Sequence, residues 1–106
     1  MFARRVYMRL KPNSAAEFTQ RLEREVIPLL RKHKGFQDEI TFIASSGTGA
    51  FGISLWDKAE NAEAYGRASY AEVAKLLATV TNGPPQVETF DVANSTFHKI
   101  AAAVVV

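Results

Sequence analysis

The 106-residue sequence contains no cysteine, only two histidines and only one tryptophan. Without cysteine there is no disulfide framework, no thiolate metal site and no cysteine nucleophile. Most of the chain separates the two histidines and no HExxH motif is present, so a metal site is not expected. No apolar run approaches the length of a membrane span, and the first residues lack the apolar core of a secretion signal. We therefore expect a soluble, cytoplasmic protein without a cofactor or membrane contact.

The residues that are present suffice for one folded domain. Hydrophobic residues make up 47% of the chain and charged residues 23%, with a net charge of +2, which is not the composition of a disordered chain. A chain of this length buries roughly 60–70% of its unfolded surface, enough for a core of its own. We expect one domain over residues 1–100, followed by an apolar tail over residues 101–106.

Positive charge is concentrated near the N-terminus. Residues 1–34 contain nine of the thirteen basic residues and only three acidic ones, so this third carries +6 and the remainder −4. Such asymmetry is one mark of a nucleic-acid surface. However, Glu23 and Glu25 interrupt the basic residues and no recognition motif is present. A solvated helix face is the preferred interpretation, and no nucleic-acid partner is expected.

The first third of the chain predicts a strand followed by a helix. Phe2–Leu10 alternates with a period of two, and Arg4 is the exception on the apolar face of this strand. After Ser14, a predicted N-cap, apolar residues recur at helical spacing. Pro28 is expected to bend this helix, and Gly35 is a plausible C-cap.

The middle of the chain predicts a β-hairpin. Its strands are Phe36–Ala44 and Ala50–Trp56, joined by a turn over Ser45–Gly49. In the first strand the alternation places Phe36, Ile40, Phe42 and Ala44 on one face. In the second, Phe51, Ile53 and Leu55 share one face, and Ala50, Gly52, Ser54 and Trp56 the other.

The last part predicts two helical segments and a final strand. Capping boxes begin the helices at Asp57 and at Ser69, and the second helix ends before Asn82–Pro85. Val87–Ile100 then reads as one long extended segment.

The predicted order is β-α-β-β-α-β, which is typical of an α+β, ferredoxin-like fold with a four-stranded antiparallel sheet and both helices on one face. We expect the other face of the sheet to carry Tyr7, Gly52 and Trp56. A face so apolar and aromatic favours packing on a second sheet, which a chain this short obtains from another subunit. A homodimer through sheet-to-sheet packing is therefore expected.

Several short motifs carry a family resemblance over nearly the whole chain. They are Leu10-Lys11-Pro12, Ile27-Pro28-Leu29, Lys34-Gly35-Phe36, Ile53–Asp57, Glu60–Tyr65 and Ser95–His98. With them the sequence resembles the antibiotic biosynthesis monooxygenase-like (ABM) proteins of the dimeric α/β-barrel superfamily. The resemblance implies a dimer whose two sheets form a barrel, with a pocket between each sheet and its helices.

Members of that family include cofactor-free oxygenases of anthrones and quinols, and haem-degrading enzymes. The haem-degrading members use an Asn on the first strand and a Trp and a His on the second helical region. The matching positions here hold Val6 or Arg5, Tyr65 and Lys75. Haem binding or degradation is therefore the less favoured expectation. A cofactor-free oxygenase needs a dry pocket, a proton acceptor and a group that stabilises the substrate anion.

Two residues are candidates for catalysis. His98 is expected late in the last strand and has the chemistry of a general base, the alternative being a polar strand-end or interface residue. Tyr65 is a candidate donor to a developing oxyanion, the alternative being a core residue with its hydroxyl in water.

Four more residues are candidates for substrate binding. Trp56 would stack on a planar substrate, or serve only in packing. Tyr7 and Arg5 share a strand face on which the arginine would hold a phenolate or carboxylate, or form an interface ion pair. His33 belongs to the apolar stripe of the first helix, where it would face the pocket or simply end the helix.

The sequence therefore favours a cofactor-independent monooxygenase of a small aromatic or quinol-like compound. The alternative is a non-catalytic, small-molecule-binding or stress-associated protein on the same dimeric scaffold, because a fold does not by itself specify an activity.

Overall fold

The computed structural model describes residues 1–98, so the expected tail at residues 101–106 lies outside the described part. The elements are β1 (Phe2–Leu10), α1 (Ala15–Arg21), the π-helical turn η1 (Leu22–Val26), α2 (Ile27–Arg31), β2 (Phe36–Ile43), β3 (Gly49–Trp56), α3 (Ala59–Ala68), α4 (Tyr70–Leu77) and β4 (Thr81–Asp91). α1, η1 and α2 together form the first predicted helical region, and α3 and α4 together form the second. Counted in this way, the elements follow the order β-α-β-β-α-β, which confirms the predicted ferredoxin-like α+β fold. None of the helices within residues 1–98 combines the length and the hydrophobicity of a membrane-spanning segment.

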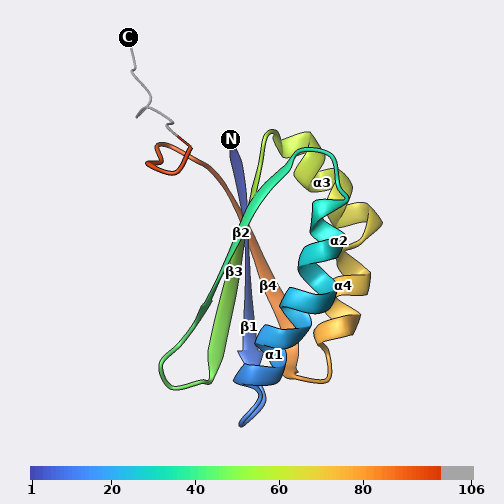
Figure 1. Ribbon diagram of the computed structural model, residues 1–106, viewed down its shortest axis with the longest axis vertical. Helices are drawn as coiled ribbons and strands as arrows, with labels where there is room; N and C mark the ends of the chain where they lie inside the picture. Colours follow the sequence, from blue (N-terminus) through green and yellow to red (C-terminus); the bar gives the residue numbers. More distant parts are fainter. Residues whose placement is uncertain (99–106) are drawn as a thin grey trace.

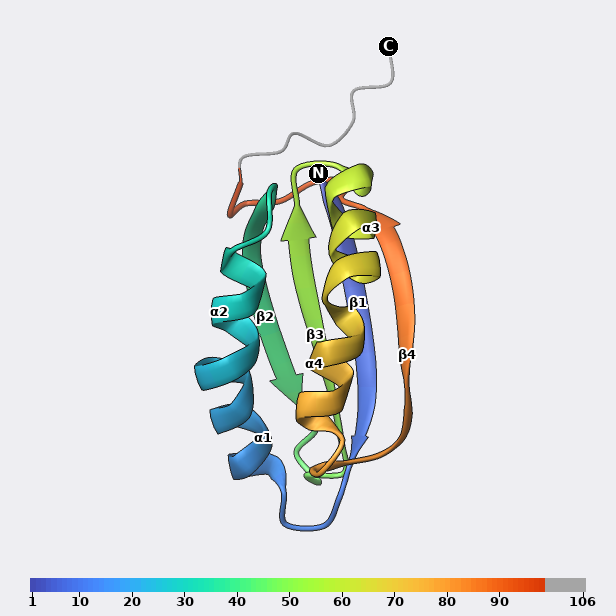
Figure 2. The ribbon, with the colours of Figure 1, turned by 90° about the vertical axis from the view of Figure 1, so that its right-hand side faces the viewer.

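The four strands form one antiparallel sheet in the order β2-β3-β1-β4. All helices lie on one side of it, as Figures 1 and 2 show. We call the opposite side the open face; no helix of the described residues covers it. The register assigns to it the side chains of Ala3, Arg5, Tyr7, Ile40, Phe42, Phe51, Ile53, Leu55, Glu88 and Phe90.

The expected facing of β3 is wrong. Trp56 pairs with Phe2 and Gly52 pairs with Val6, so both lie on the helix side of the sheet and not on the open face. Trp56 is fully buried in the core, whereas the small residues Gly52 and Ser54 leave space beneath the helices. The sequence alone does not distinguish the two faces of β3, because large apolar side chains occur on both.

The expected face of β2 is also wrong, because a bulge interrupts its alternation. Phe36 is opposite Trp56, but the register then shifts between Phe36 and Asp38, and Ile40 is opposite Ile53. One extra residue moves every later side chain to the other face. Phe36 therefore packs against the core while Ile40 lies on the open face.

The first helix contains the predicted disturbance around Pro28. Proline has no backbone N–H, so it cannot continue the regular bonding pattern of the α-helix. The turn before it is π-helical, and the N–H of Ile27 donates to the carbonyl of Leu22, five residues back. Gly35 ends the connection with φ of 84°, the left-handed conformation expected of a C-cap. The predicted side-chain cap at Ser14 is not formed.

The last strand begins earlier and ends earlier than predicted. It starts at Thr81, which pairs with Leu10, and so includes the Gly-Pro-Pro segment that the sequence assigns to a turn. β4 is an edge strand, and its register with β1 shifts between Tyr7 and Arg9, so Gly83, Pro84 and Pro85 have no paired residue in the ladder. The strand ends at Asp91, and of the described residues beyond it only Ser95 forms an isolated β-bridge, so the extended segment expected over Val87–Ile100 does not continue as a strand past Asp91.

Candidate functional site

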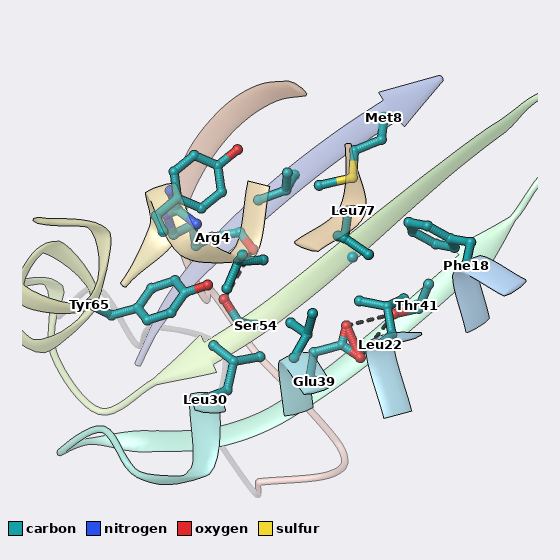
Figure 3. A pocket seen from close by; sticks show the side chains of 15 residues that line it. Arg4, Met8, Phe18, Leu22, Leu30, Glu39, Thr41, Ser54, Tyr65 and Leu77 are labelled. Atoms are coloured by element: carbon teal, nitrogen blue, oxygen red, sulfur yellow. Dashed lines mark hydrogen bonds between the residues drawn. The ribbon is translucent and has the colours of Figure 1, made fainter. Parts of the chain in front are cut away.

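A cavity lies between the helices and the sheet. About 490 Å³ of space is free of atoms there, including its open mouth. The helices contribute a mostly apolar wall that includes Phe18, Leu22, Val26, Leu30, Val73 and Leu77. Figure 3 shows Phe18, Leu22, Leu30 and Leu77 of this wall facing a floor of more polar groups on the sheet. This is the composition of a small-molecule site, in which a few polar groups orient an otherwise apolar ligand.

Three polar residues of the floor lie in one row across the sheet. Ser54 on β3 is opposite Arg4 on β1 and also opposite Glu39 on β2. Neighbouring strands are about 4.8 Å apart, so the Cα atoms of Arg4 and Glu39 are about 10 Å apart. The cavity therefore has a cationic end and a carboxyl end.

At the cationic end, Arg4 is buried, with 8% of its surface exposed. Its guanidinium carbon lies 4.1 Å from the ring centre of Tyr70 and 5.3 Å from that of Tyr65. These cation–π contacts stabilise the charge, yet none of the ion pairs formed within residues 1–98 involves Arg4. The hydroxyl of Tyr70 is buried and forms no hydrogen bond of ordinary geometry among these residues; burial raises the pKa of Tyr70, and the adjacent Arg4 guanidinium opposes that shift.

At the carboxyl end, Glu39 is partly buried and accepts hydrogen bonds from the hydroxyl of Thr41, at 2.6 and 2.9 Å from its two oxygens. Desolvation raises the pKa of Glu39, and the Thr41 hydrogen bond opposes that shift. A Cβ atom on Gly52 would lie only 3.1 Å from Oε2 of Glu39. The absence of a side chain at Gly52 thus leaves room for this carboxyl over the sheet.

Tyr65 projects its hydroxyl between these two ends (Figure 3). Burial raises the pKa of Tyr65 to about 12, with opposing influence from Arg4 and a smaller contribution in the same direction from Glu39. At neutral pH the hydroxyl is therefore protonated, so it donates a hydrogen bond and does not act as a base. Together, Tyr65 and Glu39 supply a donor and a proton acceptor to one cavity.

Trp56 lies behind Tyr65 and does not line the cavity. The ring centres of Trp56 and Tyr65 are 5.2 Å apart, and the ring of Phe36 meets the indole in a T-shaped contact with centres 5.5 Å apart. The indole N–H donates to Oγ of Ser54 at 2.9 Å, which satisfies a buried donor. The position of Trp56 is that of a packing residue that supports Tyr65.

His33 also contacts Tyr65 from outside the cavity. Its ring meets the tyrosine edge-on at 5.2 Å, and Nε2 is 2.8 Å from Oγ of Ser69. This bond ties the end of α2 to the junction of α3 and α4. It also occupies the Ser69 hydroxyl that the sequence predicts as a helix cap, and no side-chain cap is formed there.

Tyr7, Arg5 and His98 lie away from the cavity. Arg5 and Tyr7 are on the open face, where Arg5 pairs with Glu88 at 2.8 Å and lies over Phe51 at 4.6 Å. The structure thus places Arg5 in an ion pair within one chain, and the alternative considered from the sequence, an ion pair at a subunit interface, stays a prediction.

His98 follows a segment that crosses the sheet after β4. The N–H of Val92 donates to the carbonyl of Met1, and His98 Nε2 reaches Oδ2 of Asp38 on the far edge strand, at 2.7 Å. Figure 1 shows this segment on the side of the sheet away from the helices. The structure does not bring His98 and Tyr65 together.

Sequence reasoning missed Glu39, Thr41 and the functional position of Arg4. Arg4 did give a signal, as the one charged residue on an apolar strand face. Glu39 gave no such signal in the sequence, because its side chain faces the cavity only as a result of the bulge between Phe36 and Asp38.

Solved structures share this architecture. A monooxygenase from the ActVA-Orf6 gene of Streptomyces coelicolor, solved in complex with nanaomycin D, superposes with a TM-score of 0.76 at 17% identity, covering 89% of this chain and 88% of that one. A Bordetella bronchiseptica protein described as a "putative antibiotic biosynthesis monooxygenase" gives a TM-score of 0.72 at 17% identity, covering 86% of this chain and 95% of that one. The chain has the ABM fold. No family model and no curated protein matches its sequence.

The ABM fold also occurs without an assigned activity. The NE2512 protein of unknown function from Nitrosomonas europaea gives a TM-score of 0.73 at 17% identity, covering 90% of this chain and 91% of that one. The activity of the present chain therefore has to be argued from its own cavity.

Proposed function

We propose that the protein is a cofactor-independent monooxygenase of a small hydroxyaromatic compound, which reacts in the cavity between the sheet and the helices. The observation that carries this proposal is a largely apolar cavity that holds both the Glu39 carboxyl and the Tyr65 hydroxyl. The shared fold with a monooxygenase solved with nanaomycin D supports it. The compound itself supplies the electrons, so the protein needs only to bind, deprotonate and stabilise it.

The reaction begins with transfer of the phenolic proton to Glu39. A carboxylate whose pKa is raised by burial is a stronger base than one in water. The resulting oxyanion accepts a hydrogen bond from the Tyr65 hydroxyl, which burial keeps protonated. The apolar helix wall excludes water from this anion.

The electron-rich ring then reacts with oxygen. The anion forms a carbon–oxygen bond with O₂ at a ring carbon that carries one hydrogen, and the phenolic proton held by Glu39 passes to the outer oxygen. The O–O bond then breaks as the attacked carbon loses its hydrogen and becomes a carbonyl, and the outer oxygen leaves as water with these two hydrogens. The substrate gives up four electrons and O₂ accepts four, so the net reaction is substrate plus O₂ to quinone plus water.

Oxygen consumption tests the proposal. With a panel of hydroquinones and anthrones, we expect uptake above buffer, with one quinone formed for each O₂ consumed. Glu39→Gln and Tyr65→Phe should each lower kcat by about 10²-fold or more, the range of general-base and oxyanion effects. Glu63→Gln, an exposed change on α3, is the matched control. Oxygen uptake no faster than in buffer with every compound of the panel would contradict the monooxygenase activity. A non-catalytic binding protein with the same fold would then be the better explanation.

We also propose that two copies associate through their open faces. Ile40, Phe42 and Phe90 are exposed there, and the stacked pair Phe42–Phe51 adds a flat aromatic surface with ring centres 4.9 Å apart. Packing of one sheet on another would remove this apolar surface from water. The cavity lies on the other side of each sheet, so it would stay accessible in such a dimer.

A further inference from the structure

We propose that the ligand of the cavity carries an acidic group, held by Arg4, at the end opposite the hydroxyl that faces Glu39. Its chemical class is a hydroxyaromatic acid, with a carboxylate or an equally acidic group. This inference rests on the proposed function for the identity of the site, and it adds the substrate class and the orientation of the substrate.

The first observation is the unpaired charge of Arg4. A guanidinium has five N–H donors, and burial of a cation is costly unless a counter-charge or acceptors are present. Within residues 1–98 the ion pairs are formed by Arg5, Arg21 and His98, none of which is at the cavity. The faces of Tyr65 and Tyr70 stabilise the cation but accept none of its directional hydrogen bonds.

The second observation is the unpartnered hydroxyl beside it. The Tyr70 hydroxyl is buried and forms no hydrogen bond of ordinary geometry among the described residues, although the neighbouring Arg4 guanidinium opposes the effect of burial on the pKa of Tyr70; both side chains line the same cavity. One anionic group placed there would accept hydrogen bonds from both side chains. Arginine is well suited to this role because its planar fork matches a carboxylate.

The third observation is that the row of Glu39, Ser54 and Arg4 has an acidic side chain at one end and a basic side chain at the other. Glu39, Ser54 and Arg4 are in register, so the two ionisable groups lie at opposite ends of one floor. The Ser54 hydroxyl between them is occupied by the indole N–H of Trp56. A ligand bound along this row would meet a cation at one end and a proton acceptor at the other. That arrangement disfavours the reverse orientation, which would bring an anion to Glu39.

Binding under anaerobic conditions separates this inference from catalysis. The probe is 6-hydroxy-2-naphthoate, compared with its methyl ester, with 2-naphthoate and with 2-naphthol, using ligand fluorescence. We expect the hydroxy acid to bind at least about tenfold more tightly than the ester, the factor typical of one charge-assisted hydrogen bond. Equal affinities of acid and ester, or no binding by any of the four, would overturn the inference.

Variants locate the effect. In Arg4→Gln the preference for acid over ester should fall to about one, while in Arg24→Gln, an exposed change on η1, it should be retained. Arg4→Lys keeps the positive charge but lacks the planar guanidinium, so it should retain part of the preference for acid over ester. This variant provides the measurement if Arg4→Gln does not fold. An acid preference that persists unchanged in Arg4→Gln contradicts the assignment.

The two proposals fail in different ways. Oxygen uptake with neutral hydroquinones, combined with equal binding of acid and ester, would support the proposed monooxygenase activity and contradict the acid-binding role of Arg4. A preference for the acid that depends on Arg4, without oxygen uptake on any hydroxyaromatic acid, would support the proposed acid-binding site and contradict the proposed monooxygenase activity.

Discussion

At the scale of single residues, the cavity depends on a few side chains whose roles differ from their appearance in the sequence. Trp56 attracts notice as the only tryptophan, but it is a packing residue whose N–H is satisfied by Ser54. Arg4 looks like an irregularity of an amphipathic strand, but it supplies the cationic end of the cavity. Chemical type alone therefore does not rank these residues, since burial and hydrogen-bond partners decide which groups are available to a ligand.

The ionisation of Glu39 has a consequence for stability. Desolvation raises its pKa in the folded state, so the folded protein holds this proton more tightly than the unfolded chain. Stability is therefore lost as the pH rises from the usual glutamate pKa, about 4.3, through the raised value. Below that window both states are protonated and the cost of ionisation is absent.

Glu39→Gln should remove this cost. We expect the variant to gain up to a few degrees in Tm over the wild type at pH 7.5, and to lose most of that gain at pH 4. Glu63→Gln, which is exposed on α3, serves as the control and should not show a gain that depends on pH in this way. Differential scanning calorimetry at the two pH values provides the comparison. A gain of equal size at both would contradict a desolvated carboxyl at this position.

At the scale of elements, two irregularities bring the site together. The bulge in β2 turns Glu39 and Thr41 toward the helices, and the π-helical turn before Pro28 contributes Leu22 and Val26 to the cavity wall. Both are local changes of backbone register, and the second has a visible cause in the sequence. The bulge has no such marker. The helix stripes and the order of helices and strands along the chain were therefore predictable from residue spacing, whereas the facing of β2 was not.

The connection from α2 to β2 offers a direct test of packing between elements. Gly35 has φ of 84°, and a Cβ atom there would collide with the side chains of Asp57 and Asn61. Gly47 has φ of 75° but open space around it. Both changes to alanine strain the backbone, by about 1–2 kcal/mol, and only Gly35→Ala adds a collision.

Urea denaturation should therefore show a larger loss for Gly35→Ala than for Gly47→Ala. We expect the Gly35 variant to lose at least about 1 kcal/mol more of its free energy of unfolding, in the range of overpacked sites. Equal losses for the two variants would mean that the loop before β2 moves away from Asp57 at little cost.

At the scale of the whole molecule, the sheet separates two surfaces. One side forms the core and the cavity with the helices, and the other is the open face. The sequence predicted both surfaces, because its apolar residues exceed what one helix–sheet core requires. It did not predict which residues of β3 belong to each. A cytoplasmic location remains a prediction from the sequence.

Association through the open face predicts twice the mass of one chain in light scattering coupled to size exclusion, at micromolar concentration. Ile53→Glu places a charge at the centre of that face and should give a monomer. Val87→Glu, at an exposed position on the helix side of β4, should leave the mass unchanged. A wild-type protein that elutes as a monomer, or an Ile53→Glu variant that stays dimeric, would count against the open face as the interface.

The central claim is that a hydroxyaromatic ligand binds between the sheet and the helices. Methyl NMR spectra test it most directly, because leucine, isoleucine and valine methyls mark the two sides of the sheet separately. On anaerobic addition of 6-hydroxy-2-naphthoate, we predict shifts of the cavity methyls of Leu22, Val26, Leu30, Val73 and Leu77. The methyls of Ile40 and Ile53 on the open face should stay in place. Shifts confined to those open-face methyls, or none at all, would contradict the account.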